Sequence, residues 1–509
     1  MTAFHAATAV LAALVAFGTP AHADDTPTAD ELAARSHLAS APERRPETER
    51  EMWSIRVGGL EGTLETMRRG ADVAGTTLLG PFRTARGLVH GEHWHQNENG
   101  ETILDRPEPS QTERVVAQSV ARVRQPVDAW VVTTSFAGGH VTRTFYDPRT
   151  SYVVRTERTV AGRTTHTAFD DFRTDARGRT RSWHYSGGDE RPENDFDYRL
   201  LHVAEDPQID EADLAIPRDR RALVEFPTGV DVVRLPARIV DDRIYVRLQI
   251  GGRGLDFLLD TGAAALTIDD SVAQQLGLTT YGRNAVTVAG TFDSRRAIVP
   301  EIGLGPLVMH EVVLRTTPFS QREAHDTRIV GLLGFDFIDA LGLKIDYAAG
   351  TVDAYRPGTL AAPPGTAPID IRLNSGAPVG RATIGDATGE DFILDTGAAF
   401  SYVIFQRFAR AHPDAVVPSG DGRVLSGSGI GGTMSYRAVV AKRLVLGSSI
   451  FADPVGAEAM SPNALGFDNE DGLIGADLLR SFSVYLDYAA SRLYLGPRGR
   501  MPAPLGRHR

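Results

Sequence analysis

A duplicated stretch of eight residues constrains this chain more than any other feature. Residues 257–264 read FLLDTGAA, and residues 392–399 read FILDTGAA. In each copy an apolar run indicates a buried strand that stops at an acidic residue, Asp260 in the first and Asp395 in the second. A carboxylate at the end of a buried strand is costly unless other groups compensate for it. The sequence therefore predicts one structural element that is used twice.

A second pair of motifs extends this repeat. GLLGFD at 331–336 is followed by IDYAA, and GLIGAD at 472–477 is followed by LDYAA. The acidic motifs are 395 − 260 = 135 positions apart, and the Gly-Leu motifs are 475 − 334 = 141 positions apart. The second copy therefore carries 141 − 135 = 6 extra residues between its motifs. A repeat of this length predicts two related lobes rather than a solenoid.

The Asp-Thr-Gly motif after an apolar strand, with an apolar-apolar-Gly strand further on, resembles the aspartic peptidases of the pepsin and retropepsin type. The resemblance covers about residues 224–497. It implies a mainly β, bilobal double β-barrel, with lobe 1 at 224–359 and lobe 2 at 366–497. In that family the apolar-apolar-Gly strand packs under the Asp-Thr-Gly loop. The proline-rich stretch 357–368 is the expected interlobe connection.

Asp260 and Asp395 are the predicted catalytic pair. Two carboxyl groups that share one proton can take a proton from water and donate one to a peptide carbonyl oxygen. By resemblance the threonine hydroxyls brace the two loops, while the glycines allow a close backbone approach. The residues expected to support the catalytic loops are Thr261, Gly262, Thr396 and Gly397.

Four other acidic residues also pair across the repeat. Asp336 and Asp477 each open a short helical stretch, so we expect them to cap helices. Asp346 and Asp487 precede hairpin turns, and we expect them to be structural.

A glycine-rich stretch at 426–433, SGSGIGGT, resembles the flap tip of retropepsins, and its first-lobe counterpart is AGTFD at 289–293. We expect the six extra residues to lie in the second-lobe flap. The alternative is a hairpin whose glycines only turn the chain. The predicted flap residues are Gly429, Ile430, Gly431, Gly432, Gly290 and Phe292.

Residues 52–221 lack the Asp-Thr-Gly motif and predict an antiparallel β-sheet domain. Short alternating segments such as 129–134 and 152–156 are separated by turn signals. The stretch 146–150, with Phe172-Arg173 further on, resembles the lipoprotein-sorting half-barrel type. Binding of an apolar ligand, guidance of a partner and a pro-segment role all remain open for this domain.

A group of three histidines and one glutamate lies within this domain, at His90, Glu92, His93 and His95. On a strand, His93 and His95 would share a face, as metal ligands do, but His90 would lie on the other face. We therefore expect a solvated strand end and no metal site.

The first residues of the sequence predict export, and the last ones predict a tail. Residues 1–23 read as a signal peptide, with an apolar stretch at 6–17 too short to cross a membrane and a small-residue cleavage site at 21–23. The alternative is an uncleaved anchor. We interpret residues 24–51 as a linker or surface helix and 498–509 as a flexible tail. These features predict a periplasmic or secreted protein with no stable membrane span after signal removal.

Composition narrows the function further. The chain has no cysteine, which excludes disulfides, thiolate metal sites and a cysteine nucleophile, and its net charge of −11 argues against nucleic acid as a partner. We expect an exported aspartic endopeptidase that needs no cofactor, acts on a polypeptide substrate and is a monomer, since both lobes lie in one chain. One alternative is a non-catalytic bilobal binding protein whose N-terminal β domain binds an apolar ligand or partner. Another is self-processing that releases residues 24–220.

Overall fold

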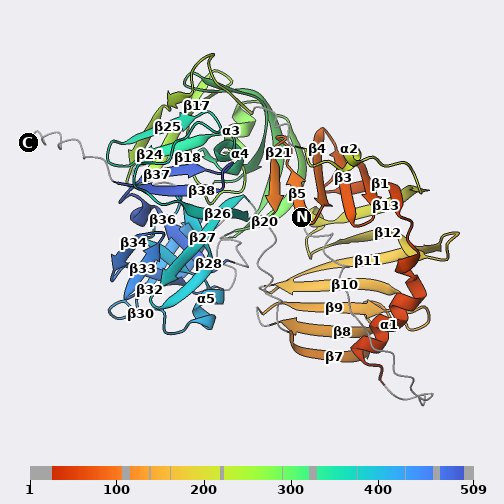
Figure 1. Ribbon diagram of the computed structural model, residues 1–509. Helices are drawn as coiled ribbons and strands as arrows, with labels where there is room; N and C mark the ends of the chain where they lie inside the picture. Colours follow the sequence, from red (N-terminus) through yellow and green to blue (C-terminus); the bar gives the residue numbers. More distant parts are fainter. Residues whose placement is uncertain are drawn as a thin grey trace, which may run out of the picture. The chain divides into compact units, whose positions relative to one another are not determined.

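The computed structural model describes residues 26–105, 115–136, 139–160, 162–217, 223–288, 290–319, 329–374, 376–429, 432–461 and 470–497 (Figure 1). The expected leader 1–23 and tail 498–509 lie outside these ranges. The chain divides into two compact units, Met1–Leu79 with Glu108–Leu214, and Gly80–Pro107 with Ala215–Arg509. No helix within the described ranges has both the length and the apolar character that crossing a membrane requires.

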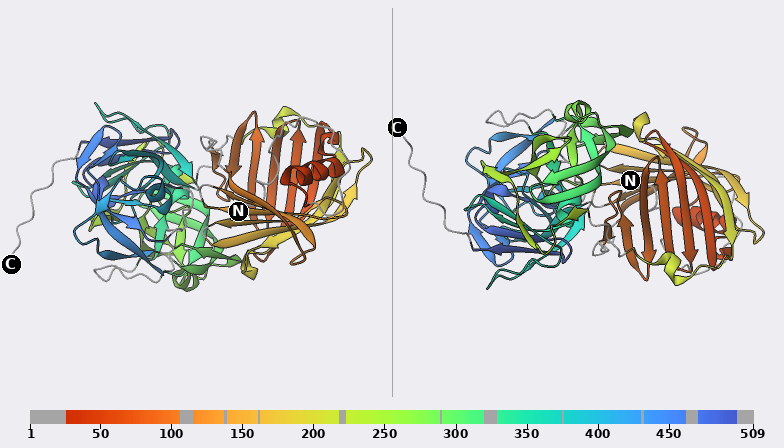
Figure 2. Two further views of the ribbon diagram at one scale, coloured as in Figure 1. Left: turned by 90° about the horizontal axis from the view of Figure 1, so that it is seen from below. Right: turned by 90° about the horizontal axis from the view of Figure 1, so that it is seen from above.

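The first unit is an antiparallel sheet whose strand order is β3-β2-β1-β13-β12-β11-β10-β9-β8-β7. Figure 2 shows helix α1 (Ala29–Ser40) lying across one face of this sheet. The helix begins with a capping box between Thr28 and Glu31, and Leu32 packs in a cluster with Val132 and Tyr146. The strands are β1 (Thr48–Val57), β2 (Leu60–Arg69), β3 (Asp72–Leu79), β7 (Val115–Val123), β8 (Ala129–Phe136), β9 (Val141–Tyr146), β10 (Val153–Val160), β11 (Arg163–Thr174), β12 (Thr180–Gly188) and β13 (Phe196–Glu205). The short helices are η1 (Pro42–Arg44), η2 (Pro192–Asn194) and α2 (Glu211–Leu214).

The second unit contains two lobes and the sheet that joins them. The elements of lobe 1 are β14 (Val224–Glu225), β16 (Ala237–Val240), β17 (Arg243–Ile250), β18 (Arg253–Leu259), β19 (Thr267–Asp269), α3 (Asp270–Gln275), β20 (Thr280–Thr287), β21 (Thr291–Leu304), β22 (Leu307–Thr317), β23 (Gly331–Leu333) and α4 (Phe335–Asp339). Those of lobe 2 are β27 (Ala377–Ile384), β28 (Ala387–Asp395), β29 (Tyr402–Ile404), α5 (Gln406–Ala411), β30 (Val417–Pro418), β31 (Val424–Gly429), β32 (Gly432–Val440), β33 (Arg443–Leu446), β34 (Ser449–Ala452), β35 (Val455–Ala459), β36 (Gly472–Gly475) and α6 (Ala476–Leu479).

Strands from both lobes form the joining sheet, in the order β15-β25-β24-β37-β38-β26. Its central pair is antiparallel and brings Ile345 of lobe 1 opposite Val484 of lobe 2. These strands are β15 (Val232–Arg234), β24 (Gly342–Asp346), β25 (Thr351–Tyr355), β26 (Ile369–Asn374), β37 (Ser483–Asp487) and β38 (Arg492–Gly496). The second unit also includes a segment from far upstream, which forms β4 (Phe82–Val89), β5 (Glu92–Gln96) and β6 (Thr102–Asp105).

The two lobes share one strand topology. In lobe 1, β18 pairs in parallel with β23, which pairs antiparallel with β19. In lobe 2, β28 pairs in parallel with β36, which pairs antiparallel with β29. A further parallel pair completes each set, β19 with β22 and β29 with β35. The predicted mainly β, bilobal fold preceded by an antiparallel sheet is confirmed, while the predicted domain boundaries stay a prediction.

The structure corrects the expected position of the six extra residues. The helices α3 and α5 begin 406 − 270 = 136 positions apart, but the strands that lead into the two hairpin tips, β20 and β31, end 429 − 287 = 142 positions apart. The extra length therefore precedes the hairpin, in the connection 412–423 that contains β30, and not in the flap tip. Residue counting between motifs could not distinguish these two positions.

Candidate active site

The two Asp-Thr-Gly loops start where the buried strands β18 and β28 end. The backbone N–H of Asp260 donates to the carbonyl of Leu333 in β23, at 3.1 Å. Asp395 lies opposite Gly475 in the parallel pairing of β28 with β36. Each loop is therefore supported by the apolar-apolar-Gly strand of its own lobe.

A reciprocal set of hydrogen bonds joins the two loops. The Thr261 hydroxyl donates to the carbonyl of Leu394 at 2.5 Å and accepts from the Thr396 N–H at 2.9 Å. The Thr396 hydroxyl donates to the carbonyl of Leu259 at 2.9 Å and accepts from the Thr261 N–H at 3.1 Å. Both threonines are buried, so these bonds are shielded from water. The arrangement fixes one loop against the other.

Glycine at the third motif position allows each loop to approach the acid of the other lobe. A Cβ on Gly262 would lie 2.8 Å from Asp395 Cγ, and a Cβ on Gly397 would lie 2.5 Å from Asp260 Cγ. Either distance is shorter than a carbon contact allows. The glycines therefore permit the two carboxyl groups to face each other.

The two carboxyl groups interact directly and titrate as a pair. Burial raises the pKa of Asp260 well above its usual value, and the charge of Asp395 and the hydrogen bond between the two groups raise it further. Burial also raises the pKa of Asp395, but N–H groups oppose that rise. Gly397 donates to Asp395 Oδ1 at 2.7 Å and Ala398 donates to it at 3.2 Å. Gly262 likewise donates to Asp260 Oδ1 at 2.9 Å, so the two carboxyl groups can share one proton between them.

The prediction that Asp336 and Asp477 cap helices is wrong. The N-caps of α4 and α6 are Gly334 and Gly475, and neither helix start has a side-chain cap. Asp336 instead accepts from the Leu266 N–H at 2.9 Å, and Asp477 accepts from the Ser401 hydroxyl. Both acids thus hold the chain just downstream of the catalytic loops.

The other pair of acids stabilises turns, as expected from the sequence. Asp346 Oδ1 accepts from the N–H of Ala348 at 3.1 Å, and Asp487 Oδ1 accepts from the N–H of Ala490 at 3.0 Å. Neither carboxylate takes part in the contacts between the catalytic loops described above.

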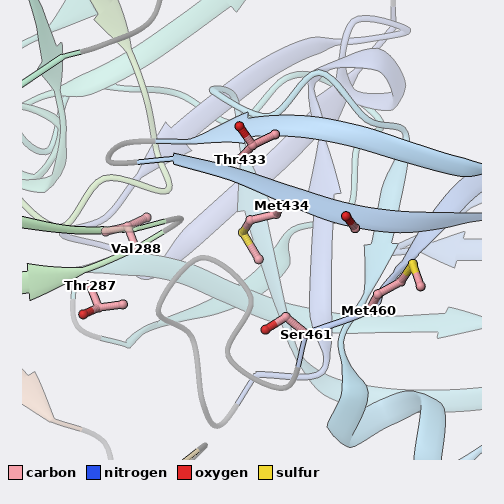
Figure 3. Close-up of a pocket in the computed structure, with 7 residues that line it drawn as sticks. Thr287, Val288, Thr433, Met434, Met460 and Ser461 are labelled. Carbon is pink, nitrogen blue, oxygen red and sulfur yellow. The ribbon is translucent and has the colours of Figure 1, made fainter.

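Two hairpins, one from each lobe, border a pocket of about 360 Å³ (Figure 3). Its residues are Thr287, Val288, Thr433, Met434, Ser435, Met460 and Ser461. Of the predicted flap residues, Gly429 pairs with Gly432 at the end of β31–β32, and Phe292 pairs with Val286 in β20–β21. Gly290 accepts from the Val288 N–H through its carbonyl, whereas Ile430 and Gly431 lie outside the described residues.

Sequence reasoning missed the side chains that link this pocket to the catalytic loop. Met434 belongs to a buried cluster against which Ala398 and Phe400 pack. Tyr436, two positions along β32, stacks at an angle on Phe400 with ring centroids 5.0 Å apart. Burial, with a contribution from the charge of Asp395, raises the pKa of Tyr436 to about 12. The alternation of β32 could have indicated this inward face, but only with the strand's partner known.

The histidine group lies around β5 and not beside the carboxyl pair. His93 is exposed on this strand, His95 is partly buried, and His90 adopts a positive φ of 52° just before it. Among the described residues, no group of three or more His, Cys, Asp or Glu side chains is arranged to hold a metal ion.

Comparison with known families agrees with this geometry. Residues 246–337, which include β18, the Asp260 loop and β23, match the aspartyl protease family. The match lies within lobe 1 and supports the resemblance first noted from the duplicated motif. A search of curated proteins found no match.

Solved structures similar to parts of this chain include three of interest. An aspartic proteinase from Irpex lacteus is 12% identical, covers 54% of this chain and 100% of its own, and gives a TM-score of 0.35. Basic 7S globulin from soybean is 12% identical, with 53% and 95% coverage and a TM-score of 0.33. An outer membrane lipoprotein-sorting protein domain from Vibrio parahaemolyticus is 8% identical, with 36% and 94% coverage and a TM-score of 0.26. All three TM-scores are below 0.5, so the functional argument relies on the site itself and on the family match.

Proposed function

We propose that this protein is an exported aspartic endopeptidase that hydrolyses peptide bonds with a water molecule activated between Asp260 and Asp395. One observation carries the proposal: the carboxyl groups of Asp260, which is partly buried, and Asp395, which is buried, face each other from different lobes, each against the glycine of the opposite loop. Burying two like charges together is unfavourable, and catalysis by a shared proton gives a reason for such an arrangement. Export is inferred from residues 1–23.

Two carboxyl groups that share one proton can act as base and acid in the same step, and we assign the base to Asp395 and the acid to Asp260. Asp395, whose ionised form accepts the N–H bonds of Gly397 and Ala398, takes a proton from the water. The water oxygen attacks the peptide carbon, while Asp260 donates its proton to the carbonyl oxygen and a neutral gem-diol forms. In the second step Asp395 gives its proton to the leaving nitrogen and Asp260 recovers the gem-diol proton. The C–N bond breaks, and the pair returns to its starting state.

The pocket between the hairpins supports a polypeptide as substrate. The lining is mixed, and within it Val288, Met434 and Met460 supply adaptable apolar surface, since methionine side chains can repack around different shapes. Thr287 and Thr433 bring hydroxyl groups to the same pocket. We propose that it receives an apolar substrate side chain near the cleaved bond, while the surrounding polar groups accommodate the peptide backbone.

Digestion of casein over pH 3–8, with and without a statine-type inhibitor, tests this function. We expect inhibitor-sensitive fragments from the wild type and none from Asp260→Asn or Asp395→Asn. Asp487→Asn is the matched control, because this acid serves a turn, and it should cleave like the wild type. If the wild type produces no inhibitor-sensitive fragment at any pH in this range, the peptidase proposal is wrong and a binding protein with this fold is favoured.

A further inference from the structure

A turn from far upstream in the sequence forms part of the peptidase unit. Residues 97–101, which we call the Asn97 turn, connect β5 to β6 and belong to the same compact unit as both lobes. The Asn97 side chain organises the turn, because its Oδ1 accepts from the N–H groups of Asn99 and Glu101, both at 3.0 Å. Its backbone N–H and carbonyl also bond within the turn, to Glu101 and Gly100. The turn is thus fixed by its own hydrogen bonds. The amide nitrogen of the Asn97 side chain is the donor that reaches beyond the turn.

Two neighbouring side chains attach this turn to lobe 1. Asn99 is buried, and its amide bonds both backbone groups of Val313 in β22, donating at 2.9 Å and accepting at 2.8 Å. Glu98 Oε1 accepts from Arg296 at 2.7 Å and from Arg315 at 3.0 Å. Although burial alone would raise it, the pKa of Glu98 is lowered because the charges of Arg315 and Arg296 outweigh that effect. Breaking one partner of such a buried pair is costly, so the turn is held firmly.

A third contact of the Asn97 turn is made with Asp336, the acid that bonds to the chain just after the Asp260 loop. Asn97 Nδ2 donates to Asp336 Oδ1 at 2.7 Å, while Asp336 Oδ2 accepts from the Leu266 N–H at 2.9 Å. Leu266 lies six positions after Asp260, at the downstream end of its loop. Asp336 comes two positions after the Gly-Leu-Leu-Gly stretch that supports this loop. The amide of Asn97, beside Asn99 as a second side-chain partner of Asp336, therefore holds the acid that ties the loop to its supporting strand.

In lobe 2 the corresponding acid receives its hydrogen bond from a side chain of the same lobe. Asp477 is the counterpart of Asp336, and Ser401, at 401 − 266 = 135 positions, is the counterpart of Leu266. The Ser401 hydroxyl donates to Asp477 directly. Leucine has no side-chain donor, so lobe 1 lacks this local bond and receives an amide N–H from the upstream turn instead. The difference at one repeat position thus explains why the upstream amide is needed.

We propose that Asn97 is a positioning residue for Asp260, acting through Asp336, so that the upstream segment is an integral part of the peptidase site and not a removable pro-segment. This inference rests on the proposed peptidase function. Release of residues 24–220 would remove the amide donor and the two attachments beside it. Self-processing at that point would therefore inactivate the enzyme rather than activate it.

The variant Asn97→Asp tests this role with little change in shape. Its carboxylate can still accept the N–H bonds of Asn99 and Glu101, but it cannot donate to Asp336 when ionised. Burial raises the pKa of Asp336 to about 6. The other charged groups around it are Glu101, whose Oε2 also accepts from the Asn97 amide at 3.0 Å, and the ion group of Glu98 with Arg296 and Arg315. At pH 5 the two facing carboxyl groups can share a proton, and as pH rises through 6 to 7 that proton is progressively lost and the two groups repel each other.

We expect kcat of Asn97→Asp at pH 7 to fall by about 10- to 100-fold with little change in KM, because a small displacement of a catalytic group has effects of this size. The loss should shrink at pH 5, and the loss in Tm should be larger at pH 7 than at pH 5. Asn194→Asp is the matched control, because Asn194 also donates to a buried acid, Asp189 at 2.9 Å, in the first unit. It should lower Tm and leave kcat unchanged.

Wild-type kcat in Asn97→Asp at pH 7, with a Tm loss independent of pH, would overturn the inference. The outcome differs if the peptidase proposal itself fails, since the wild type would then show no inhibitor-sensitive cleavage. In that case a pH-dependent Tm loss in Asn97→Asp still supports the Asn97–Asp336 contact as the hold on the loop, and a pH-independent loss overturns it.

Discussion

The two lobes present the same acidic loop but secure it in different ways. In lobe 2 the acid after the Gly-Leu strand, Asp477, bonds to Ser401 within the lobe. In lobe 1 the corresponding Asp336 bonds to Leu266 and to Asn97, which is 239 positions away in the sequence. The shared strand topology thus fixes the loop's course, while the polar contacts that hold it depend on individual residues. Lobe 1 depends on chain outside the repeat, and lobe 2 does not.

The largest expected effect tests whether the lobes contribute equally to chemistry. Asp260→Ala and Asp395→Ala should each reduce kcat by at least about 10³-fold, and the double variant should be scarcely worse, because residues that act as a unit are not additive. Single-turnover kinetics with a fluorogenic peptide would measure this. Substantial activity in Asp395→Ala but not in Asp260→Ala would show that lobe 2 is only a scaffold, or that two chains combine their first lobes.

The next test concerns the threonine bonds, where the lobes are symmetric. Thr261→Val and Thr396→Val each remove a buried hydroxyl and leave a carbonyl and an N–H without their partner. We expect each variant to lower the free energy of unfolding by about 1–3 kcal/mol, with nearly equal effects. Urea denaturation followed by circular dichroism would measure both. Clearly unequal losses in unfolding free energy would mean that one loop depends on the other for its stability.

Substitution of Asp336 and of Asp477, the acids that bond to the chain just after the two loops, should lower stability unequally. Asp336→Ala leaves the Leu266 N–H and the Asn97 amide without their acceptor in a buried site, whereas the Asp477 side chain is 38% exposed and its partners can reach water. We therefore expect Asp336→Ala to cost about 1–3 kcal/mol of unfolding free energy and Asp477→Ala less than about 1 kcal/mol. Thermal and urea denaturation would compare them. Equal losses would contradict the proposed dependence of lobe 1 on the upstream turn.

The smallest expected effect is a gain in stability. Asp260→Asn removes a partly buried carboxyl group whose pKa is raised. The folded variant therefore avoids the cost of ionising or protonating this group as pH rises. A raised pKa lowers wild-type stability as pH rises from the unfolded pKa through the folded one. The variant should therefore be more stable than the wild type at pH 7, and the gain should disappear in acid. Denaturation at pH 4 and pH 7 would check the sign, and a gain confined to acid would contradict it.

The sequence by itself determined the architecture of the two-lobed unit. The apolar runs before Asp260 and Asp395 and the repeated Gly-Leu motifs indicate paired strands from local composition and spacing. Because the same pattern occurs twice, it also predicted which two carboxyl groups would face each other. Hydrophobic periodicity is a local signal, so a duplicated local signal was sufficient for this part of the fold.

Only the tertiary structure decided how the catalytic loops are supported. Asp336 looked like a helix cap because it stands at the start of α4, yet Gly334 occupies the cap and the carboxylate turns to Leu266 and Asn97. Asn97 itself looked like an ordinary turn residue. Hydrogen bonds between distant residues leave no periodic trace in a single sequence, since any donor that the fold brings within reach can serve. The mismatch between Leu266 and Ser401 was the one visible sign, and it has meaning only when Asp336 and Asp477 are known to need a donor.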